Sequence, residues 1–129
     1  MKLINTINFS NIIRLHALEM TSRAGTSHIG SMFSIADIVA VLFNDILKTK
    51  PQKNNFKKNP KDYFILSKGH AGGIIYAALA EKGFFPLKRL ETYCKNGSTL
   101  SGHISHYQVP GVDFSSGSLG HGLSVSCGL

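Results

Sequence analysis

The chain has 129 residues, of which 43% are hydrophobic and 16% are charged. This length and composition suit one globular domain and exclude a disordered tail. Its apolar runs are only a few residues long, so we expect neither a membrane-spanning segment nor a membrane partner. The N-terminus lacks an uninterrupted apolar region followed by a small-residue cleavage site, so no signal peptide is expected.

The net charge of +7 is concentrated in one segment. Residues 48–61, "KTKPQKNNFKKNPK", contain six of the fourteen basic residues and no acidic residue, and the rest of the chain carries a net charge of +1. A nucleic-acid surface would combine basic residues with interleaved aromatic ones, and only Phe56 is available there. We therefore interpret residues 48–61 as a solvated basic connector and expect no nucleic-acid partner.

Two helices are predicted in the first half of the chain. The first begins at Ser10 as its cap and continues to about Arg23, and Gly25 ends it. Its apolar stripe comprises Ile12, Ile13, Leu15, Leu18 and Met20. After the turn "GTSHIGS", Ser34 and Asp37 resemble a capping box. A second helix then continues to about Lys48, with Ile35, Ile38, Val39, Leu42, Phe43 and Ile46 at helical spacing.

The second half begins with a predicted strand. "DYFILS", residues 62–67, is a short apolar run between polar segments, which is typical of one buried strand. Residues 74–83, "IIYAALAEKG", predict a helix that Gly83 closes, and residues 86–97 predict another that begins at Pro86 and ends at Gly97. From Gly97 to Gly122 no periodicity is sustained, and a loop of this length in a compact domain is usually functional.

Histidines beside glycines are the strongest candidates for chemistry. His28, His70, His103, His106 and His121 all lie in glycine-containing segments, whereas His16 lies in the first predicted helix and is interpreted as structural. Glycine lets a ligand approach the backbone closely, and imidazole can donate, accept or transfer a proton near neutral pH.

Two other types of site fit these residues less well. His103 and His106 with His70 or His28 could bind zinc, but the spacing is loose and neither cysteine joins them. "GSLGHG", residues 117–122, lacks the lysine of a phosphate-binding P-loop, so alone it indicates only a tight backbone near a helix N-terminus. Cys94 and Cys127 form no CxxC pair, which favours a reducing, cytoplasmic location.

The order of the motifs is more specific than any one of them. The chain has S-H-x-G-x-x-x-S at residues 27–34 and F-I-L-S-K-G-H-A at 64–71. These are followed by G-H at 102–103, P-G-V at 110–112 and G-S-L-G-x-G at 117–122. From about residue 10 to Leu129 the chain resembles the N-terminal part of transketolases, which use thiamine diphosphate. The resemblance implies an α/β parent fold with a parallel sheet, of which residues 1–129 form a partial, mostly helical N-terminal domain with the basic connector at 48–61.

The resemblance also implies roles for individual residues. His28, His70 and His103 correspond to catalytic histidines; His70 lies near the cofactor diphosphate, and His28 and His103 hold substrate hydroxyls. Gly117, Ser118 and Leu119 match the loop against thiamine diphosphate, and His121 belongs to the substrate site, where the family usually has glutamine. Ile104 replaces a proline that commonly follows the histidine at 103, which leaves the sugar specificity open.

The implied reaction transfers a two-carbon glycolaldehyde unit from a ketose to an aldose. Family members bind Mg²⁺ or Ca²⁺ through a Gly-Asp-Gly motif and a later asparagine, and a glutamate activates the cofactor; these groups are absent from this sequence. We therefore expect a fragment that is inactive alone, with sugar phosphates as substrates and a homodimer or a partner half-subunit as the assembly. Alternatives are dihydroxyacetone synthase, deoxyxylulose-phosphate synthase, and a non-catalytic remnant or interaction fragment.

Overall fold

The computed structural model describes residues 2–51 and 62–129, and within these ranges it contains helices and no strand. Its helices are α1 (Lys2–Ala24), α2 (Ile29–Phe33), α3 (Ala36–Val41), the π-helical turn η1 (Leu42–Ile46), the 3-10 turn η2 (Gly69–Ala71), α4 (Gly72–Glu81), the 3-10 turn η3 (Leu87–Thr92) and α5 (His121–Gly128). The mostly helical character expected from the sequence is confirmed, whereas no parallel sheet is present in the described part of the chain.

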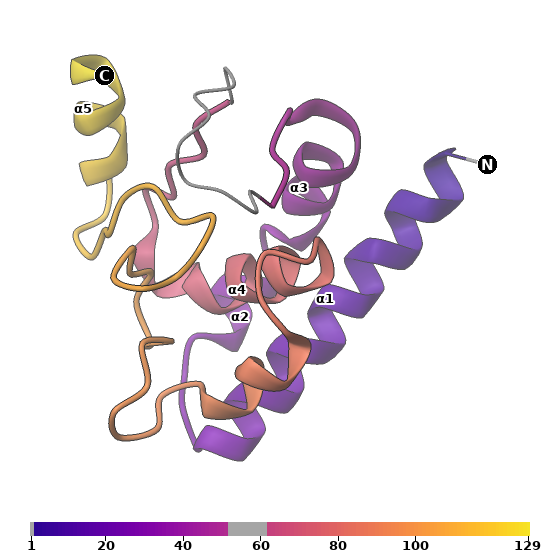
Figure 1. Ribbon diagram of the computed structural model, residues 1–129, viewed down its shortest axis with the longest axis vertical. Coiled ribbons are helices and arrows are strands. Elements are labelled where there is room, and N and C mark those ends of the chain that lie inside the picture. Colours follow the sequence, from indigo (N-terminus) through magenta and orange to yellow (C-terminus); the bar gives the residue numbers. More distant parts are fainter. Residues whose placement is uncertain (1, 52–61) are drawn as a thin grey trace.

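Helix α4 lies at the centre of the molecule (Figure 1). Every residue from Gly72 to Ala80 is buried, and the helix packs against α1, α2, α3 and η3. Its small and apolar side chains, "GGIIYAALA", allow neighbours to approach from all sides. The largest fully buried side chains of the core are Tyr76, Tyr93, Ile13, Met20, Met32, Ile74, Ile75, Leu79, Leu100 and Val39.

Helix α1 begins eight residues before the predicted cap, so the prediction that Ser10 starts this helix is wrong. Ser10 lies inside α1 with its side chain buried against α3. The stripe is also only partly correct, because Ile13 and Met20 are buried while Leu15 and Leu18 are at least half exposed. Thr6 Oγ1 donates to Asp45 Oδ2 at 3.0 Å, which ties the unpredicted first turns of α1 to η1.

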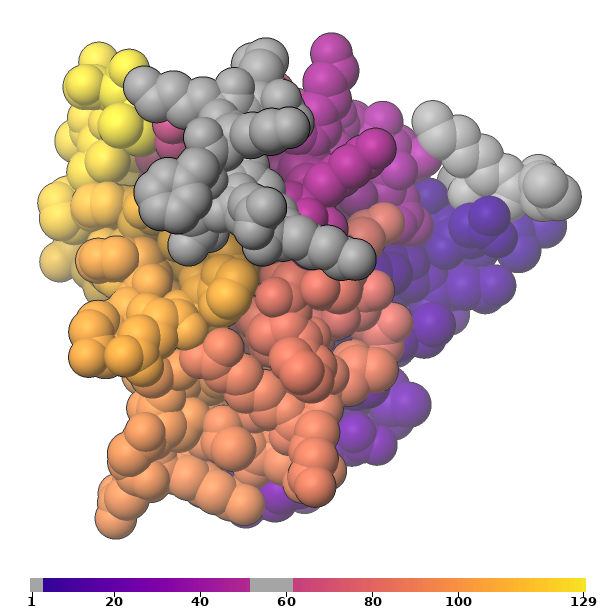
Figure 2. Space-filling model, viewed as in Figure 1, coloured from indigo at the N-terminus to yellow at the C-terminus, as the bar shows by residue number. Residues whose placement is uncertain are grey.

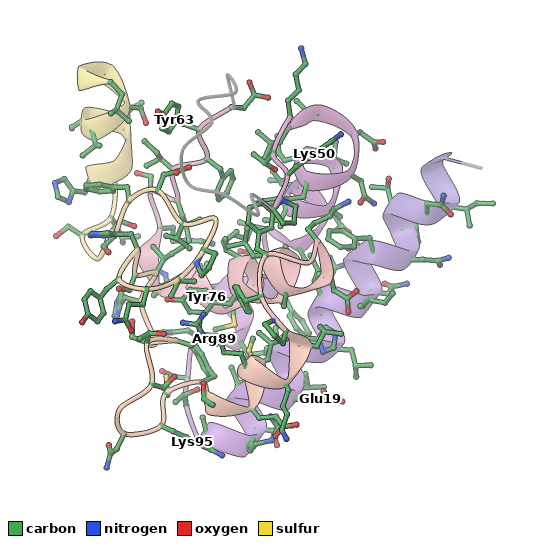
Figure 3. The ribbon with its side chains drawn as sticks, viewed as in Figure 1. Glu19, Lys50, Tyr63, Tyr76, Arg89 and Lys95 are labelled. Atoms are coloured by element: carbon green, nitrogen blue, oxygen red, sulfur yellow. The ribbon has the colours of Figure 1, made fainter. Side chains whose placement is uncertain are left out.

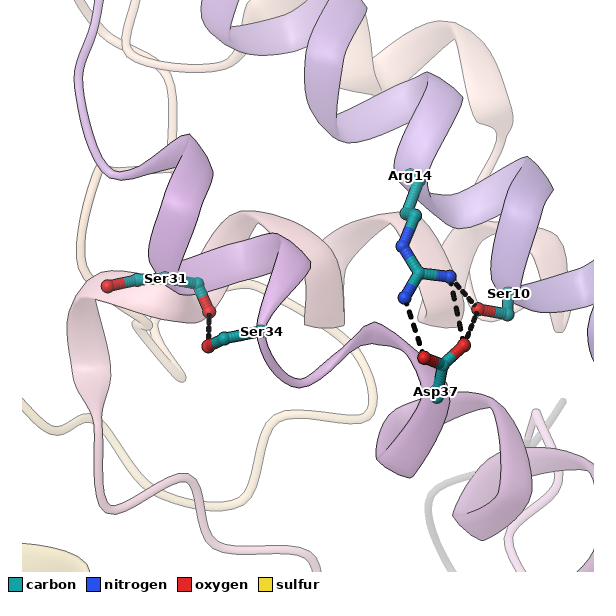
Figure 4. A network of polar contacts seen from close by, with 5 residues as sticks. All are labelled: Ser10, Arg14, Ser31, Ser34 and Asp37. Atoms are coloured by element: carbon teal, nitrogen blue, oxygen red, sulfur yellow. Dashed lines mark hydrogen bonds and ion pairs between the residues drawn. The ribbon is translucent and has the colours of Figure 1, made fainter.

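The predicted capping box at Ser34 and Asp37 is also wrong. Asp37 instead accepts hydrogen bonds from Ser10 Oγ at 2.5 Å and from Arg14 Nη2 at 2.8 Å, both on α1 (Figure 4). Ser34 Oγ donates to the carbonyl of Ser31, and the backbone cap of α3 is Ile35. A tertiary ion pair between two helices thus replaces the local cap that the sequence pattern predicts.

Residues 62–67 are not a strand, although they were predicted to be one. Tyr63 is exposed, Phe64 and Ile65 are half-buried, and only Leu66 is buried. A strand exists only when a neighbouring strand completes its hydrogen-bond ladder, and the described residues provide none. The basic connector falls mainly on residues 52–61, which lie outside the described residues.

Of the two helices predicted in the second half, the one over residues 74–83 is confirmed by α4, whereas the one over residues 86–97 is wrong for most of its length. Gly83 follows the end of α4 with a φ of +79°, as the predicted closing glycine requires. The helix predicted over 86–97 is much shorter, because only Leu87–Thr92 are helical, as a 3-10 turn. Residues 97–120 form an irregular loop that covers one side of α4, and Figure 2 shows this loop in orange beside η3, with α1 along the edge. Within residues 2–51 and 62–129, no helix is both long and apolar enough to span a membrane.

Candidate functional site

Three histidine rings from distant parts of the sequence lie together. The ring centroids of His28 and His70 are 5.3 Å apart, those of His28 and His103 are 5.6 Å apart, and those of His70 and His103 are 6.4 Å apart. We call these three residues the histidine cluster. His28 and His70 are half-buried and His103 is exposed, so the cluster is open to solvent on one side.

The cluster is assembled from three different backbone elements. His28 caps α2 in the left-handed conformation, with φ of 77° and ψ of 3°. His70 lies in η2 at the entrance to α4, and His103 lies in the long loop. The left-handed region is uncommon for residues with a side chain, but histidine is among those found there more often. The turn at residue 28 therefore directs an imidazole toward the start of α4.

The pKa of His70 lies below that of an ordinary histidine. Burial removes solvent from the ring, and the electrostatic influence of His28, Lys68 and His103 further disfavours its protonation. At neutral pH the ring is therefore uncharged, with one nitrogen that donates and one that accepts a hydrogen bond. Such a ring can bind a polar ligand or transfer a proton.

The long loop lies against the backbone on both sides of His70. A Cβ added to Gly69 would be 2.0 Å from the Ser116 carbonyl oxygen, and one added to Gly72 would be 2.7 Å from the Ile104 nitrogen. Ile104 N donates to the Gly69 carbonyl at 2.9 Å. Glycine at these two positions thus permits the close approach that brings His103 and the 116–117 backbone beside His70.

The predicted cofactor loop is exposed and has free donors. Gly117, Ser118 and Leu119 are all exposed, and no acceptor among the described residues pairs with their amides. The loop is nevertheless fixed at both ends, because Ser116 Oγ donates to the Leu66 carbonyl and Gly120 N donates to the Ser67 carbonyl at 3.1 Å. Unpaired amides directly before a helix N-terminus can donate hydrogen bonds to an anionic group.

Two other histidines of the second half, His106 and His121, lie outside the cluster. His121 begins α5, and its ring packs against Phe114 at 5.8 Å; no contact joins it to His28, His70 or His103 within the described residues. His106 Nδ1 lies 2.6 Å from Ser115 Oγ. The structural interpretation of His16 is supported, because its Nε2 lies 2.7 Å from Glu81 Oε1 on α4.

The sequence did not single out Lys68, which contributes a positive charge beside the cluster. Lys68 Nζ donates to the Ser31 carbonyl at 3.1 Å and to Ser34 Oγ at 2.9 Å. Ser34 belongs to the S-H-x-G-x-x-x-S motif and Lys68 to the F-I-L-S-K-G-H-A motif, so the co-occurrence of the two motifs was the available signal. Among residues 2–51 and 62–129, no group of three or more His, Cys, Asp or Glu side chains is arranged to hold a metal ion.

Comparison with known proteins links this geometry to one family. Residues 6–129 match the family described as "Transketolase, thiamine diphosphate binding domain". The chain is 37% identical over 120 residues to the 6-deoxy-6-sulfo-D-fructose transketolase subunit SqwG of Clostridium sp. (strain MSTE9), covering 93% of this chain and 43% of that protein. It is 42% identical over 121 residues to a transketolase of Pongo abelii, covering 93% of this chain and 19% of that protein.

A solved structure agrees with these matches. A transketolase from Leishmania mexicana superposes with a TM-score of 0.85 and 27% sequence identity, covering 95% of this chain and 18% of that one. This chain therefore spans less than half the length of each of these relatives.

Proposed function

The chain belongs to the transketolase family, as its N-terminal thiamine-diphosphate-binding domain, and on that premise we propose that the histidine cluster and residues 117–119 form part of a cofactor and sugar site. One observation carries this proposal: three imidazole rings from three segments lie within 6.4 Å of one another, beside a loop with unpaired amides. The parent fold is proposed to be α/β, with a parallel sheet formed by segments other than those described.

We assign the residues as follows. His70 and the amides of Gly117, Ser118 and Leu119 contact the cofactor, with His70 toward the diphosphate. His28 and His103 offer donors and acceptors to sugar hydroxyls and assist proton transfer, and His121 lies at the outer part of the substrate site. When bound, thiamine diphosphate supplies the electron sink for breaking and forming carbon–carbon bonds. An uncharged His70 can move a proton at neutral pH without a large energetic cost.

The proposed overall reaction transfers a two-carbon glycolaldehyde unit between sugars or sugar phosphates in carbohydrate metabolism. The Clostridium relative is named as a subunit, which supports a second polypeptide or a second copy of the chain as the partner. A divalent cation, Mg²⁺ or Ca²⁺, would be held by residues supplied from outside this sequence. A cytoplasmic location remains a prediction based on Cys94 and Cys127, which are both free and exposed.

Backbone amide NMR during titration with thiamine diphosphate tests the site directly. An exposed helix N-terminus stabilises a nearby anion by only about 0.3–1 kcal/mol. We therefore expect binding no tighter than millimolar, which corresponds to about 4 kcal/mol. Chemical-shift changes should centre on His70 and residues 117–119, and thiamine without its diphosphate should produce smaller ones. Changes confined to Lys48 and Lys50 would instead indicate nonspecific binding to the basic segment.

Two matched histidine variants show whether the chemical-shift changes require His70 in particular or any histidine of the chain. We expect His70→Ala to abolish the shifts at residues 117–119, whereas His106→Ala removes a histidine outside the cluster and should leave them intact. Activity is expected only after a polypeptide carrying the remaining part of a transketolase is added, in an assay with a ketose and an aldose phosphate. Turnover by residues 1–129 alone would contradict the proposal that groups outside these residues complete the site.

A further inference from the structure

One buried hydroxyl connects the central helix to the loop that carries His103. Tyr76 lies on α4 with none of its surface exposed, and Figure 3 shows it in the middle of the molecule. Its Oη donates to the His103 carbonyl at 3.1 Å and accepts a hydrogen bond from Ser105 N at 2.9 Å. The single hydroxyl therefore holds the backbone on both sides of Ile104.

Ile104, which lies between the two residues bonded by Tyr76, is itself bonded to the entrance of α4. Ile104 N donates to the Gly69 carbonyl at 2.9 Å, and Ile104 packs against Gly72, where any Cβ would lie 2.7 Å from Ile104 N. Gly69 and Gly72 flank His70 closely in sequence, so the loop is attached to both the start of α4 and the turn that contains Tyr76. These contacts fix the backbone of His103 relative to that of His70.

Tyr76 bonds backbone atoms of the loop, so the His103 imidazole remains free to contact a ligand. The His103 side chain is exposed, and its carbonyl also accepts a hydrogen bond from Ser101 Oγ at 2.7 Å. Tyr76 itself is enclosed by the core, since residues 72–80 are all buried. Burial raises the pKa of Tyr76, so its hydroxyl keeps the proton that it donates to His103.

We propose that Tyr76 is a positioning residue of the transketolase-type site: through its hydroxyl it holds the His103 ring within reach of His28 and His70. It acts only through the loop backbone, at residues 103 and 105, and touches neither substrate nor cofactor. The importance of this positioning for sugar binding rests on the function proposed above, but the positioning itself is a property of the chain alone.

The test is NMR of the 129-residue chain without any ligand, comparing wild type with Tyr76→Phe. In the wild type, nuclear Overhauser effects should connect the rings of all three clustered histidines, and the Ser105 amide should exchange slowly with solvent. In Tyr76→Phe, we expect the effects that involve His103 to weaken or vanish while that between His28 and His70 persists. Exchange of the Ser105 amide should accelerate about tenfold, as loss of one buried hydrogen bond predicts.

Tyr93→Phe is the matched control. Tyr93 is also buried and its ring packs against Tyr76 at 6.4 Å, but residues 103 and 105 are bonded by the Tyr76 hydroxyl and not by that of Tyr93. This variant should therefore leave the His103 contacts and the exchange of Ser105 unchanged. If both variants lose the His103 contacts, a general effect on packing replaces the proposed role, and if neither does, the role is refuted.

Two further outcomes remain distinguishable. Should Tyr76→Phe fail to fold, the wild-type measurement decides, because rapid exchange of the Ser105 amide would show that Tyr76 does not hold the loop. Should the histidine contacts behave as expected while thiamine diphosphate causes no shift at His70, the cofactor assignment fails and the positioning role stands.

Discussion

Helices α4 and α1 are both rich in apolar residues, but they are covered very differently. Every residue of α4 from Gly72 to Ala80 is buried, whereas α1 buries one face through Ile13 and Met20 and exposes apolar residues on the other. Four large side chains of α1 are at least half exposed, namely Ile4, Ile7, Leu15 and Leu18. Apolar character therefore marks a surface that can be buried, while the neighbouring elements decide which face becomes the core.

The largest effect should come from a cavity in α4. Ile74→Ala removes a fully buried side chain and is expected to lower the free energy of unfolding by about 2–5 kcal/mol. Leu18→Ala on α1, where the side chain is 50% exposed, should change it by only about 0.5 kcal/mol or less. Urea unfolding followed by circular dichroism measures both, and equal losses would show that the two helices are covered alike.

Urea unfolding can also test how closely the long loop packs against the backbone beside His70. Gly69→Ala would place a Cβ 2.0 Å from the Ser116 carbonyl oxygen, and we expect a loss of about 1–3 kcal/mol from the resulting displacement. Gly30→Ala in α2 provides the control, because no atom lies within 4 Å of its added Cβ. That variant should be neutral or stabilising, by up to about 1 kcal/mol. A neutral Gly69→Ala variant would show that the 116–117 backbone is not held against η2.

The contact between α1 and α3 predicts a modest pH dependence. Hydrogen bonds from the Arg14 guanidinium and, to a smaller extent, from the Ser10 hydroxyl lower the pKa of Asp37 from 3.8 to about 2. The stabilisation is complete above about pH 4 and is lost as the pH falls through 2, because the unfolded state binds the proton first. Since Asp37 is largely exposed, solvent screening limits the effect to less than about 1 kcal/mol.

Unfolding free energies measured between pH 5 and 2 test this ion pair. Asp37→Asn should remove part of the pH dependence in this interval, whereas Glu91→Gln, at an exposed carboxylate on η3, should leave it unchanged. An unaltered profile in Asp37→Asn would mean that the ion pair with Arg14 does not persist in solution.

Substitutions on the exposed face of α1 should change the free energy of unfolding least, but they should clearly change self-association. Replacing Leu15 and Leu18 together by Ser should alter the free energy of unfolding by no more than about 0.5 kcal/mol per site. Exposed apolar residues in a continuous stripe promote association, so the variant should be less prone to self-associate than the wild type. Size-exclusion chromatography over a range of concentrations measures this, and a wild-type chain that stays monomeric would contradict it.

The sequence correctly predicts those elements whose ends and faces are determined by residues close to one another in the chain. Gly83 ends α4 because a left-handed residue is needed there, and the apolar run before it identifies the buried helix. Ser10, Ser34 and Asp37 mislead because their side chains bond across the structure. Asp37 pairs with an arginine 23 residues earlier, and no local pattern reports that partner. The strand predicted over residues 62–67 is wrong for the same reason, since a strand forms only beside a neighbouring strand that completes its hydrogen bonds.

The candidate site, too, is predicted from the sequence only in part. The ordered motifs identify His28, His70 and His103 without giving any distance between them, and the structure brings their rings together. The same motifs do not place His121, whose ring packs on Phe114 instead. Tyr76 escapes notice because a tyrosine in an apolar helix signals only core packing, and its hydroxyl acquires a role only through the folded loop.

The left-handed backbone at residue 28 restricts which amino acids can replace its histidine. The turn accepts glycine, asparagine, aspartate and histidine most readily, and it disfavours β-branched and bulky residues. Of the four tolerated residues, only histidine carries an aromatic ring that titrates near neutral pH. A saturation library at this position should therefore yield few folded variants, and the backbone alone would account for much of the intolerance that a screen for activity would attribute to chemistry.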